Sequence, residues 1–421
     1  MGREDDRDYI PRRIEELIRS SLALFRTTLI NGPRQAGKTT LARRLCTELG
    51  GTYRSLDDRG TLAAALRDPD GFVSTPGLVV IDEVQRAGDA VILAVKARVD
   101  RDTSPGQFVL TGSTRFLTTP RISESLAGRV EIIDLWPLSQ GEIHRTRERF
   151  IDRLLTSPDE TRAAARRAPS VARDDYWVRI CSGGYPAVRG ASRSVRSRWL
   201  GAYARALTER EVLDVVRVRH PGHLPRLLRL VASSTAREMN ANAIANDFQL
   251  PWATIDGYLA MLETLFVWHG LPPWSRNLPA RVIRHRKAHM VDSGLAAYLL
   301  GVDERELADP LSKTVGQLTE TFVAGEIARQ ITWSEESPIL HHYRDKAREV
   351  DLILETADGR VAAIEVKSAA SVSSADFRAL GYLRDRIGGP FVQGAVLYTG
   401  SDVLSFGDRL SALPISSLWA E

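Results

Sequence analysis

Residues 27–41, TTLINGPRQAGKTTL, constrain the fold of this chain more than any other segment. Gly32 is followed by four residues and then by Gly-Lys-Thr at 37–39, the G-x-x-x-x-G-K-[ST] pattern of a phosphate-binding loop. The apolar pair at 29–30 predicts a buried strand before the loop, and apolar residues at helical spacing predict a helix after it. A strand, a glycine-rich loop and a helix in this order predict an α/β domain with a parallel sheet.

The residue types of this loop suit a polyphosphate. Glycines let the backbone curl so that successive N–H groups point at phosphate oxygens, and the helix N-terminus adds unpaired donors. Lys38 can reach the β- and γ-phosphates, and Thr39 can offer its hydroxyl to Mg²⁺. We therefore predict that the chain binds ATP and Mg²⁺. The predicted contacts are Gly32, Pro33, Arg34, Gln35, Ala36, Gly37, Lys38, Thr39 and Thr40.

A second acidic motif follows the apolar, β-branched run at 78–81, which predicts a strand buried on both faces. The run ends in Asp82-Glu83, a Walker B pattern. Asp82 is predicted to hold Mg²⁺, and Glu83 to orient and polarise the attacking water. The sequence therefore predicts a site that hydrolyses ATP.

Two further groups are candidates for sensing or stabilising the γ-phosphate. Thr111 and Ser113 end the predicted strand at 108–113, where a polar strand end is the alternative interpretation. Arg129 precedes another apolar strand and is predicted to act as a charge-stabilising finger, on its own site or a neighbouring one. A structural ion pair is an equally good interpretation of Arg129.

Several blocks together resemble a known family. They are GPRQAGKTTL, LVVIDEVQ, LTGSTRF, SLAGRVEIIDLWPLS and GGYPAV, and they occur in the order seen in the prokaryotic AAA-type (AAA_14) ATPases that carry a DUF4143 C-terminal region. The resemblance implies an AAA+-like nucleotide domain with Lys38, Thr39, Asp82 and Glu83 as its working residues. The Asp-Glu-x-Gln form, with Gln85, is typical of this family.

The middle of the chain is basic. Residues 141–230 contain 19 arginines and 10 acidic residues, although the net charge of the whole chain is only +4. Such a segment is expected of a nucleic-acid contact, and a solvated helical face is the alternative. We predict an ATPase domain at 1–140, a helical lid or connector at 141–225, a winged-helix-like segment at 226–275 and a C-terminal domain at 276–421.

Three helices and a strand are predicted in the segment 226–275, an order typical of a winged helix-turn-helix. The exposed face of the third helix would include Thr254, Asp256 and Glu263. Two carboxylates face DNA phosphates poorly, so a packing module or protein contact is an equally good interpretation.

The C-terminal region collects charged residues on a predicted helix and hairpin. Glu320 lies on the helix predicted for 315–330, and Asp351 lies on the strand predicted for 349–354. Asp358-Gly359 is a hairpin signal, and the return strand carries Glu365 and Lys367 on one face. The hairpin can therefore bring these carboxylates and the lysine together.

This order, Glu then Asp then Glu-x-Lys, resembles the PD-(D/E)xK nuclease superfamily. The resemblance implies an α/β restriction-endonuclease-like domain in which Glu320, Asp351 and Glu365 hold Mg²⁺ or Mn²⁺ and Lys367 is catalytic. Members with this fold can bind nucleic acid without cutting it. Two hypotheses therefore follow: an ATPase coupled to a metal-dependent nuclease, or an ATP-dependent switch in a toxin–antitoxin or defence system with a non-cleaving scaffold.

Composition indicates the cellular compartment in which we expect the protein. The 421 residues contain no apolar run long enough to span a bilayer, and the charged N-terminus is not a secretory signal. Two distant cysteines suggest a reducing compartment, so we expect a cytoplasmic protein. Nucleic acid is the expected partner, and a homo-oligomer or a protein partner is left open.

Overall fold

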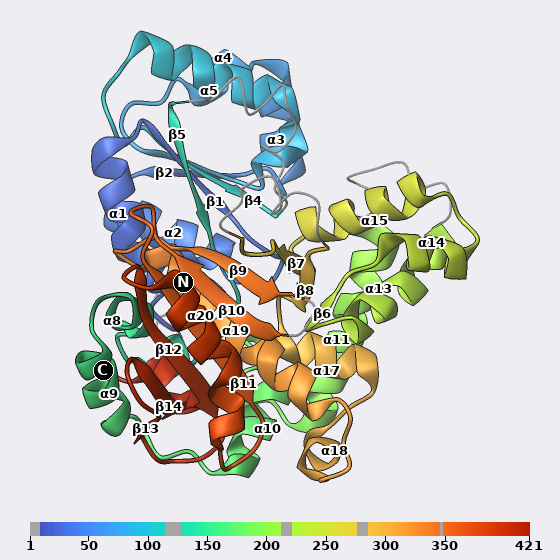
Figure 1. The fold of residues 1–421 in the computed structure, drawn as a ribbon. Helices are drawn as coiled ribbons and strands as arrows, with labels where there is room; N and C mark the ends of the chain where they lie inside the picture. Colours follow the sequence, from blue (N-terminus) through green and yellow to red (C-terminus); the bar gives the residue numbers. More distant parts are fainter. Residues whose placement is uncertain (1–8, 114–127, 212–220, 276–284, 346–347) are drawn as a thin grey trace. The chain divides into compact units, whose positions relative to one another are not determined.

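The computed structural model describes residues 9–113, 128–211, 221–275, 285–345 and 348–421. The chain divides into two compact units. Unit 1 comprises Met1–Leu138 with Thr264–Phe266, and unit 2 comprises Ser139–Glu263 with Val267–Glu421 (Figure 1). Parts of two predicted blocks, at 114–116 and 125–127, lie outside the described residues. The predicted domain boundaries stay predictions.

Unit 1 is an α/β domain. Its elements are α1 (Ile14–Leu24), β1 (Thr27–Asn31), α2 (Lys38–Glu48), β2 (Thr52–Ser55), α3 (Arg59–Arg67), α4 (Pro69–Val73), β3 (Val79–Asp82), α5 (Asp89–Arg101), β4 (Phe108–Gly112) and β5 (Val130–Asp134). Among the described residues the strands form one parallel sheet in the order β2-β3-β4-β1-β5. This confirms the predicted P-loop, AAA+-like parallel sheet.

The strand order explains why the phosphate loop and the acidic motif meet. Strands β1, β3 and β4 are buried along their whole lengths, as is typical of a parallel sheet that is covered on both faces. Because the strands are parallel, their carboxyl ends lie at one edge of the sheet. The loop at 32–37 leaves β1 at that edge, and Asp82 ends β3 there.

The first helix begins later than the sequence suggests. The apolar pattern predicts a helix over 9–25, whereas α1 begins at Ile14. The Glu15 carboxylate accepts hydrogen bonds from the Arg12 N–H (2.8 Å) and the Tyr9 hydroxyl (2.6 Å). These contacts hold the residues before α1 as a separate segment.

The start of unit 2, over residues 139–211, is mostly helical. Its helices are α7 (Gln140–His144), α8 (Phe150–Thr156), α9 (Pro158–Arg166), α10 (Arg173–Ser182) and α11 (Arg193–Ala206), followed by a π-helical segment at Leu207–Glu211. The polar, alanine- and arginine-rich sequence at 157–170 predicts a mobile loop or a frayed helix. Instead, the Ser157 side chain caps α9 and Pro158 occupies its first turn, both of which favour a helix start.

Three helices and a small sheet follow. They are α13 (Leu224–Ser233), α14 (Ala241–Phe248) and α15 (Trp252–Thr264), with the strands β6 (Arg237–Glu238), β7 (Trp268–Leu271) and β8 (Lys287–Met290). The strands pair antiparallel in the order β6-β8-β7. Glu263 forms ion pairs with Arg286 at 2.6 and 2.8 Å, so this carboxylate joins the helix to the sheet.

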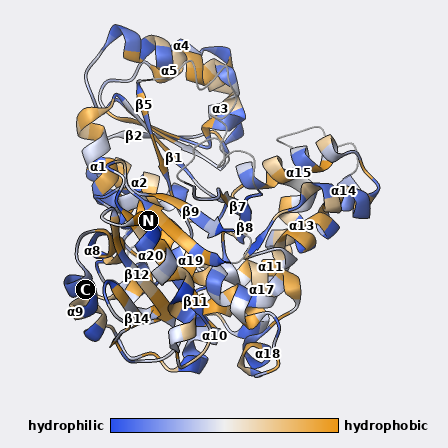
Figure 2. Ribbon diagram, viewed as in Figure 1, coloured by the Kyte–Doolittle hydropathy of each residue, from blue (hydrophilic) through white to orange (hydrophobic). Residues whose placement is uncertain are grey.

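The C-terminal part of unit 2 contains a mixed sheet and covering helices. Its elements are α17 (Ser293–Leu300), α18 (Glu304–Ala308), α19 (Val315–Trp333), β9 (Ile339–Arg344), β10 (Glu349–Glu355), β11 (Val361–Lys367), α20 (Arg378–Ile387), β12 (Phe391–Tyr398), β13 (Leu404–Ser405) and β14 (Leu410–Pro414). The described strands are ordered β13-β14-β12-β11-β10-β9. Leu380 and Leu383 of α20 pack in one core with residues of β10, β11 and β12, and hydrophobic colours follow β12 and β14 in Figure 2.

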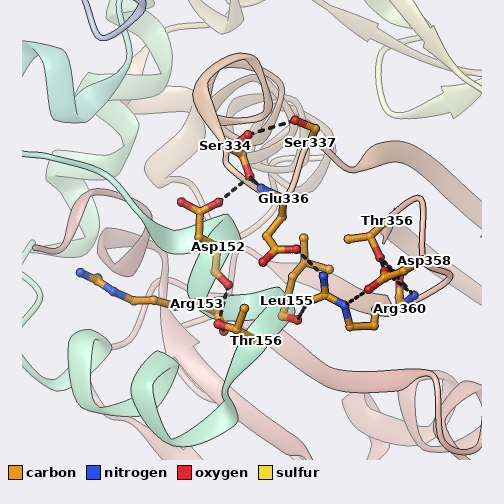
Figure 3. A network of polar contacts seen from close by, with 10 residues as sticks. All are labelled: Asp152, Arg153, Leu155, Thr156, Ser334, Glu336, Ser337, Thr356, Asp358 and Arg360. Atoms are coloured by element: carbon orange, nitrogen blue, oxygen red, sulfur yellow. Dashed lines mark hydrogen bonds and ion pairs between the residues drawn. The ribbon is translucent and has the colours of Figure 1, made fainter. Parts of the chain in front are cut away.

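Arg360 connects the β10–β11 hairpin to neighbouring segments through hydrogen bonds and ion pairs (Figure 3). Its guanidinium donates to the Leu155 carbonyl at 2.8 Å and to Asp358 at 2.8 Å, and it pairs with Glu336. The side chain of Arg360 is 34% exposed, so water screens these ion pairs in part. The contacts join the hairpin, the end of α8 and the segment after α19.

We expect Arg360→Met to lower the free energy of unfolding by about 1–2 kcal/mol, because a network of charged hydrogen bonds is lost. Urea unfolding of the full chain measures this change. The exposed Arg378 of α20 provides a control, since Arg378→Met removes the same charge without touching the hairpin. Equal urea midpoints for the two variants would show that the network contributes nothing to stability.

Candidate nucleotide site and C-terminal carboxylate cluster

The phosphate loop has the backbone that its glycines suggest. Gly37 adopts φ of 100° and Gln35 adopts φ of 64°, both in the left-handed region. A Cβ atom on Gly32 would lie 2.1 Å from the Leu135 carbonyl oxygen, so only glycine fits at the start of the loop. The curled backbone required for phosphate binding is therefore present.

Lys38 points back into the loop. It begins α2, its residue is only 4% exposed, and its ammonium donates to the carbonyl oxygens of Gly32 (2.8 Å) and Pro33 (2.9 Å). The loop thus holds the positive charge where the sequence predicts the phosphates. Of the other predicted contacts, Ala36 is buried, Arg34 is half-buried, and Gln35 and Thr40 are exposed.

Asp82 lies beside this loop and is almost completely buried. Its carboxylate accepts hydrogen bonds from the hydroxyls of Thr39 (3.0 Å), Tyr53 (2.8 Å) and Thr111. Hydroxyl and carboxylate oxygens are the hard ligands that Mg²⁺ prefers, so Thr39 and Asp82 fit a magnesium ion.

Glu83 and its neighbours form the other side of the site. Glu83 adopts φ of 56°, an uncommon backbone for a non-glycine residue, and its N–H donates to Thr111 Oγ1 at 3.0 Å. The Gln85 amide donates to Ser113 Oγ at 2.9 Å and to the Glu83 carboxylate. The structure therefore brings Thr111, Ser113 and Gln85 to the Walker B pair.

Two residues at the site were missed by the sequence analysis. The Arg12 guanidinium donates to the Ala36 carbonyl (2.7 Å) and the Trp136 carbonyl (2.6 Å), bracing the loop from outside. Tyr53 reaches Asp82 from the neighbouring strand, and burial raises the pKa of its hydroxyl to about 12, so it stays a donor. A sequence signal existed only for Tyr53, because residues 52–57 have the pattern of a strand and parallel strands end at one edge of the sheet.

Arg129 lies directly before β5. It forms an ion pair with Asp100 of α5, and its side chain is 30% exposed. The structural ion pair foreseen as an alternative is thus present. The role of Arg129 as a finger stays a prediction.

A separate cluster of charged residues occupies unit 2. Strands β10 and β11 pair antiparallel, and Asp351 and Glu365 lie one residue beyond the Leu352–Ile364 pair. Asp351 Oδ2 accepts the Val366 N–H at 2.9 Å, and Lys367 donates to Glu365 at 2.7 Å. The hairpin thus brings together Asp351, Glu365 and Lys367, as the sequence predicted.

Lys287 of β8 completes the cluster and was not anticipated. Its ammonium lies 2.6 Å from Glu320, 2.9 Å from Asp351 and 3.0 Å from Glu349. The side chain of Lys287 is only 1% exposed. The signal that could have found it is its rarity, because this arginine-rich chain has only six lysines.

The charged groups of this cluster shift one another's pKa values. Burial acts to lower the pKa of Lys287, but the carboxylates of Asp351, Glu320 and Glu349 outweigh it and raise that pKa above its usual value. Burial and then the Asp351 charge raise the pKa of Glu320 and bring the pKa of Glu365 to about 8. The positive charge of the Lys287 ammonium therefore stabilises the carboxyl groups around it.

Two other carboxylates have structural contacts. Glu326 accepts the Gln140 N–H at 2.8 Å, well away from the direction taken by Glu320 on the same helix. Asp292 caps α17 through the Leu295 N–H (2.8 Å) and accepts the Gly184 N–H (2.7 Å).

No helix in the part of the chain that the structure describes is long and apolar enough to cross a membrane.

Comparisons with known families agree with the geometry of the nucleotide site. Residues 25–144 match the model described as an AAA domain, and residues 315–418 match the domain of unknown function DUF4143. The chain carries an AAA-type ATPase domain and a C-terminal DUF4143 region. Residues 173–306 match a further domain of unknown function, DUF8612, which the sequence analysis did not anticipate.

Two mycobacterial proteins are similar to most of this chain. Uncharacterized proteins of Mycobacterium tuberculosis and Mycobacterium bovis are each 28% identical over 406 residues, covering 95% of this chain and 82% of the relative. Among solved structures, the Thermotoga maritima RuvB Holliday junction branch migration motor is 18% identical, with a TM-score of 0.28 over 62% of this chain and 89% of RuvB. AMPPCP-bound DnaA from Aquifex aeolicus is 14% identical, with a TM-score of 0.26 over 59% of this chain and 85% of DnaA.

Proposed function

We propose that the chain binds ATP with Mg²⁺ at the loop 32–40 and hydrolyses it. The observation that carries this proposal is the meeting of the two motifs: the Thr39 hydroxyl, at the start of α2, lies 3.0 Å from the Asp82 carboxylate. The phosphate loop and the acidic strand end thus form one site, as a nucleotide with its magnesium requires.

Each residue of the site has a role in this proposal. The loop N–H groups and Lys38 bind the phosphates, and Thr39 and Asp82 hold Mg²⁺, which offsets the charge of the β- and γ-phosphates. Glu83 orients and polarises the attacking water, with Gln85 and Ser113 fixing the position of its carboxylate. Arg129 remains a proposed finger, because the fold can place such a group in the same or a neighbouring copy.

We expect Glu83→Gln to separate binding from hydrolysis. Loss of the base should lower the rate of ATP hydrolysis by about 100-fold or more, because general-base groups contribute about 10²–10⁴-fold. Calorimetry should show that ATP binds to this variant about as tightly as to the unchanged chain. Glu131→Gln on β5 is the control, and no uptake of ATP by the unchanged chain would overturn the proposal.

For the C-terminal region we favour the switch over the nuclease. Asp351, Glu365 and Lys367 converge as a metal-dependent nuclease would need, but the donor set does not fit Mg²⁺ or Mn²⁺. The Lys287 ammonium already contacts Glu320 and Asp351, two of the three proposed ligands. A nucleotide-dependent switch whose nuclease-like domain is a non-cleaving scaffold agrees with this arrangement.

Nucleic acid remains the proposed partner of such a switch. The basic composition of 141–230 supports it, whereas the winged-helix-like segment supports it less. Asp256 is exposed on α15, and Glu263 is engaged with Arg286. Binding to DNA or RNA that weakens steeply with salt would support this partner, and a flat salt dependence would count against it.

A further inference from the structure

We propose that the Lys287 ammonium is the resident cation of the Glu320–Asp351 carboxylate cluster, so that this cluster takes up no divalent metal ion and cuts no phosphodiester. The inference deepens the proposed scaffold role of the C-terminal region. It does not depend on ATP hydrolysis at the nucleotide site.

The geometry gives the ammonium the place of a metal ion. Nζ lies within 3.0 Å of carboxylate oxygens of Glu320, Asp351 and Glu349, and it donates hydrogen bonds to Asp351 and Glu349. A magnesium ion sharing Glu320 and Asp351 would need oxygens at about 2.0–2.1 Å, in the space that Nζ occupies. A magnesium ion bound to these carboxylates would also lie next to the Lys287 ammonium, and the two positive charges would repel each other strongly where water is excluded.

The second oxygen of Asp351 is also engaged. Oδ1 lies 2.9 Å from Lys287 Nζ, and Oδ2 accepts the Val366 N–H at 2.9 Å. A metal ion bound to either oxygen would therefore have to share it with a hydrogen-bond donor that is already in place. Glu365, the third proposed ligand, accepts a hydrogen bond from Lys367 at Oε1 only.

The backbone of Lys287 is fixed in place. β8 is the central strand of its sheet, and Lys287 is paired with Leu271 of β7 on one side and Glu238 of β6 on the other. Pairing with both neighbouring strands fixes its backbone, and burial of the side chain, which is only 1% exposed, confines the ammonium to the cluster. Lys287 is therefore a permanent cation of the cluster and not a movable gate.

The test removes the ammonium and asks whether a metal ion replaces it. In Lys287→Met the buried carboxylates lose their counter-charge, so we expect the thermal midpoint to fall by about 6–10 °C. Millimolar Mn²⁺, added without nucleotide, should restore most of that loss. The double variant Lys287→Met/Asp351→Asn should lose the response to Mn²⁺, and Lys313→Met, at an exposed position, should behave like the unchanged chain.

A second test uses the unchanged chain and so does not require any Lys287 variant to fold. Its thermal midpoint should respond to Mn²⁺ no more than that of Asp351→Asn does, and it should leave DNA and RNA whole with Mg²⁺ or Mn²⁺, with and without ATP. A Mn²⁺ response lost on Asp351→Asn, or metal-dependent cutting, would overturn the inference. Calorimetry with ATP on the same samples keeps a failure of the nucleotide site separate.

Discussion

Lys38→Ala is expected to weaken ATP binding by more than about 100-fold and to abolish hydrolysis. The loop directs the Lys38 ammonium inward, through its contacts with the carbonyls of Gly32 and Pro33. Removing a charge-assisted contact from an enclosed phosphate site costs about 3 kcal/mol or more, which corresponds to that loss of affinity. Calorimetry with ATP and Mg²⁺, together with phosphate release, measures both effects.

The comparison needs a control for stability, because Lys38 also satisfies two carbonyls. Lys38→Arg keeps the charge but is too large for the enclosed loop, so its binding should also fall while its fold persists. Lys96→Ala on α5 removes a partly exposed lysine of the same unit and should change neither measurement. ATP binding by Lys38→Ala at the strength of the Lys96→Ala control would remove this lysine from the site.

The nucleotide site could be predicted because its determinants are local. Gly32, Lys38 and Asp82 belong to short motifs whose neighbours already indicate strand, loop and helix. Parallel strands then bring their carboxyl ends together without any further information. Arg12 and its bond to the Ala36 carbonyl could not be predicted in this way, because nothing in the sequence links a residue before α1 to that loop.

The carboxylate cluster, in contrast, depends on a residue that is distant in the sequence. The hairpin signal at Asp358-Gly359 and the period of two on β11 predicted that Asp351 and Glu365 would meet. The sequence could not show that Lys287, on another sheet, would lie between the carboxylates. A tertiary contact therefore decides whether these residues can hold a metal ion, although their order along the chain is complete.

Glu326 is expected to make stability depend on pH between about 4.5 and 7. The residue is buried on α19, and burial raises the pKa of its carboxyl to about 7, although Arg329 and the Gln140 N–H oppose that shift. In the unfolded chain the pKa is about 4.3. Between these values the folded state holds a proton that the unfolded state has lost.

The sign follows from this difference in bound protons. The free energy of unfolding should fall as pH rises from about 4.5 to 7, by roughly 3 kcal/mol in total from this group, and then change no further. Glu326→Gln keeps an oxygen that can accept the Gln140 N–H but cannot ionise. This variant should therefore lose that part of the slope and be more stable than the unchanged chain at pH 8.

Urea unfolding at several pH values measures the difference between the two proteins. Glu365 and Glu320 also have raised pKa values, so the unchanged chain retains other contributions of the same sign, and only the difference isolates Glu326. Glu335→Gln, at a side chain that is 79% exposed, should leave the pH profile unchanged. Parallel profiles for Glu326→Gln and the unchanged chain would mean that Glu326 stays ionised, compensated by Arg329, throughout this range.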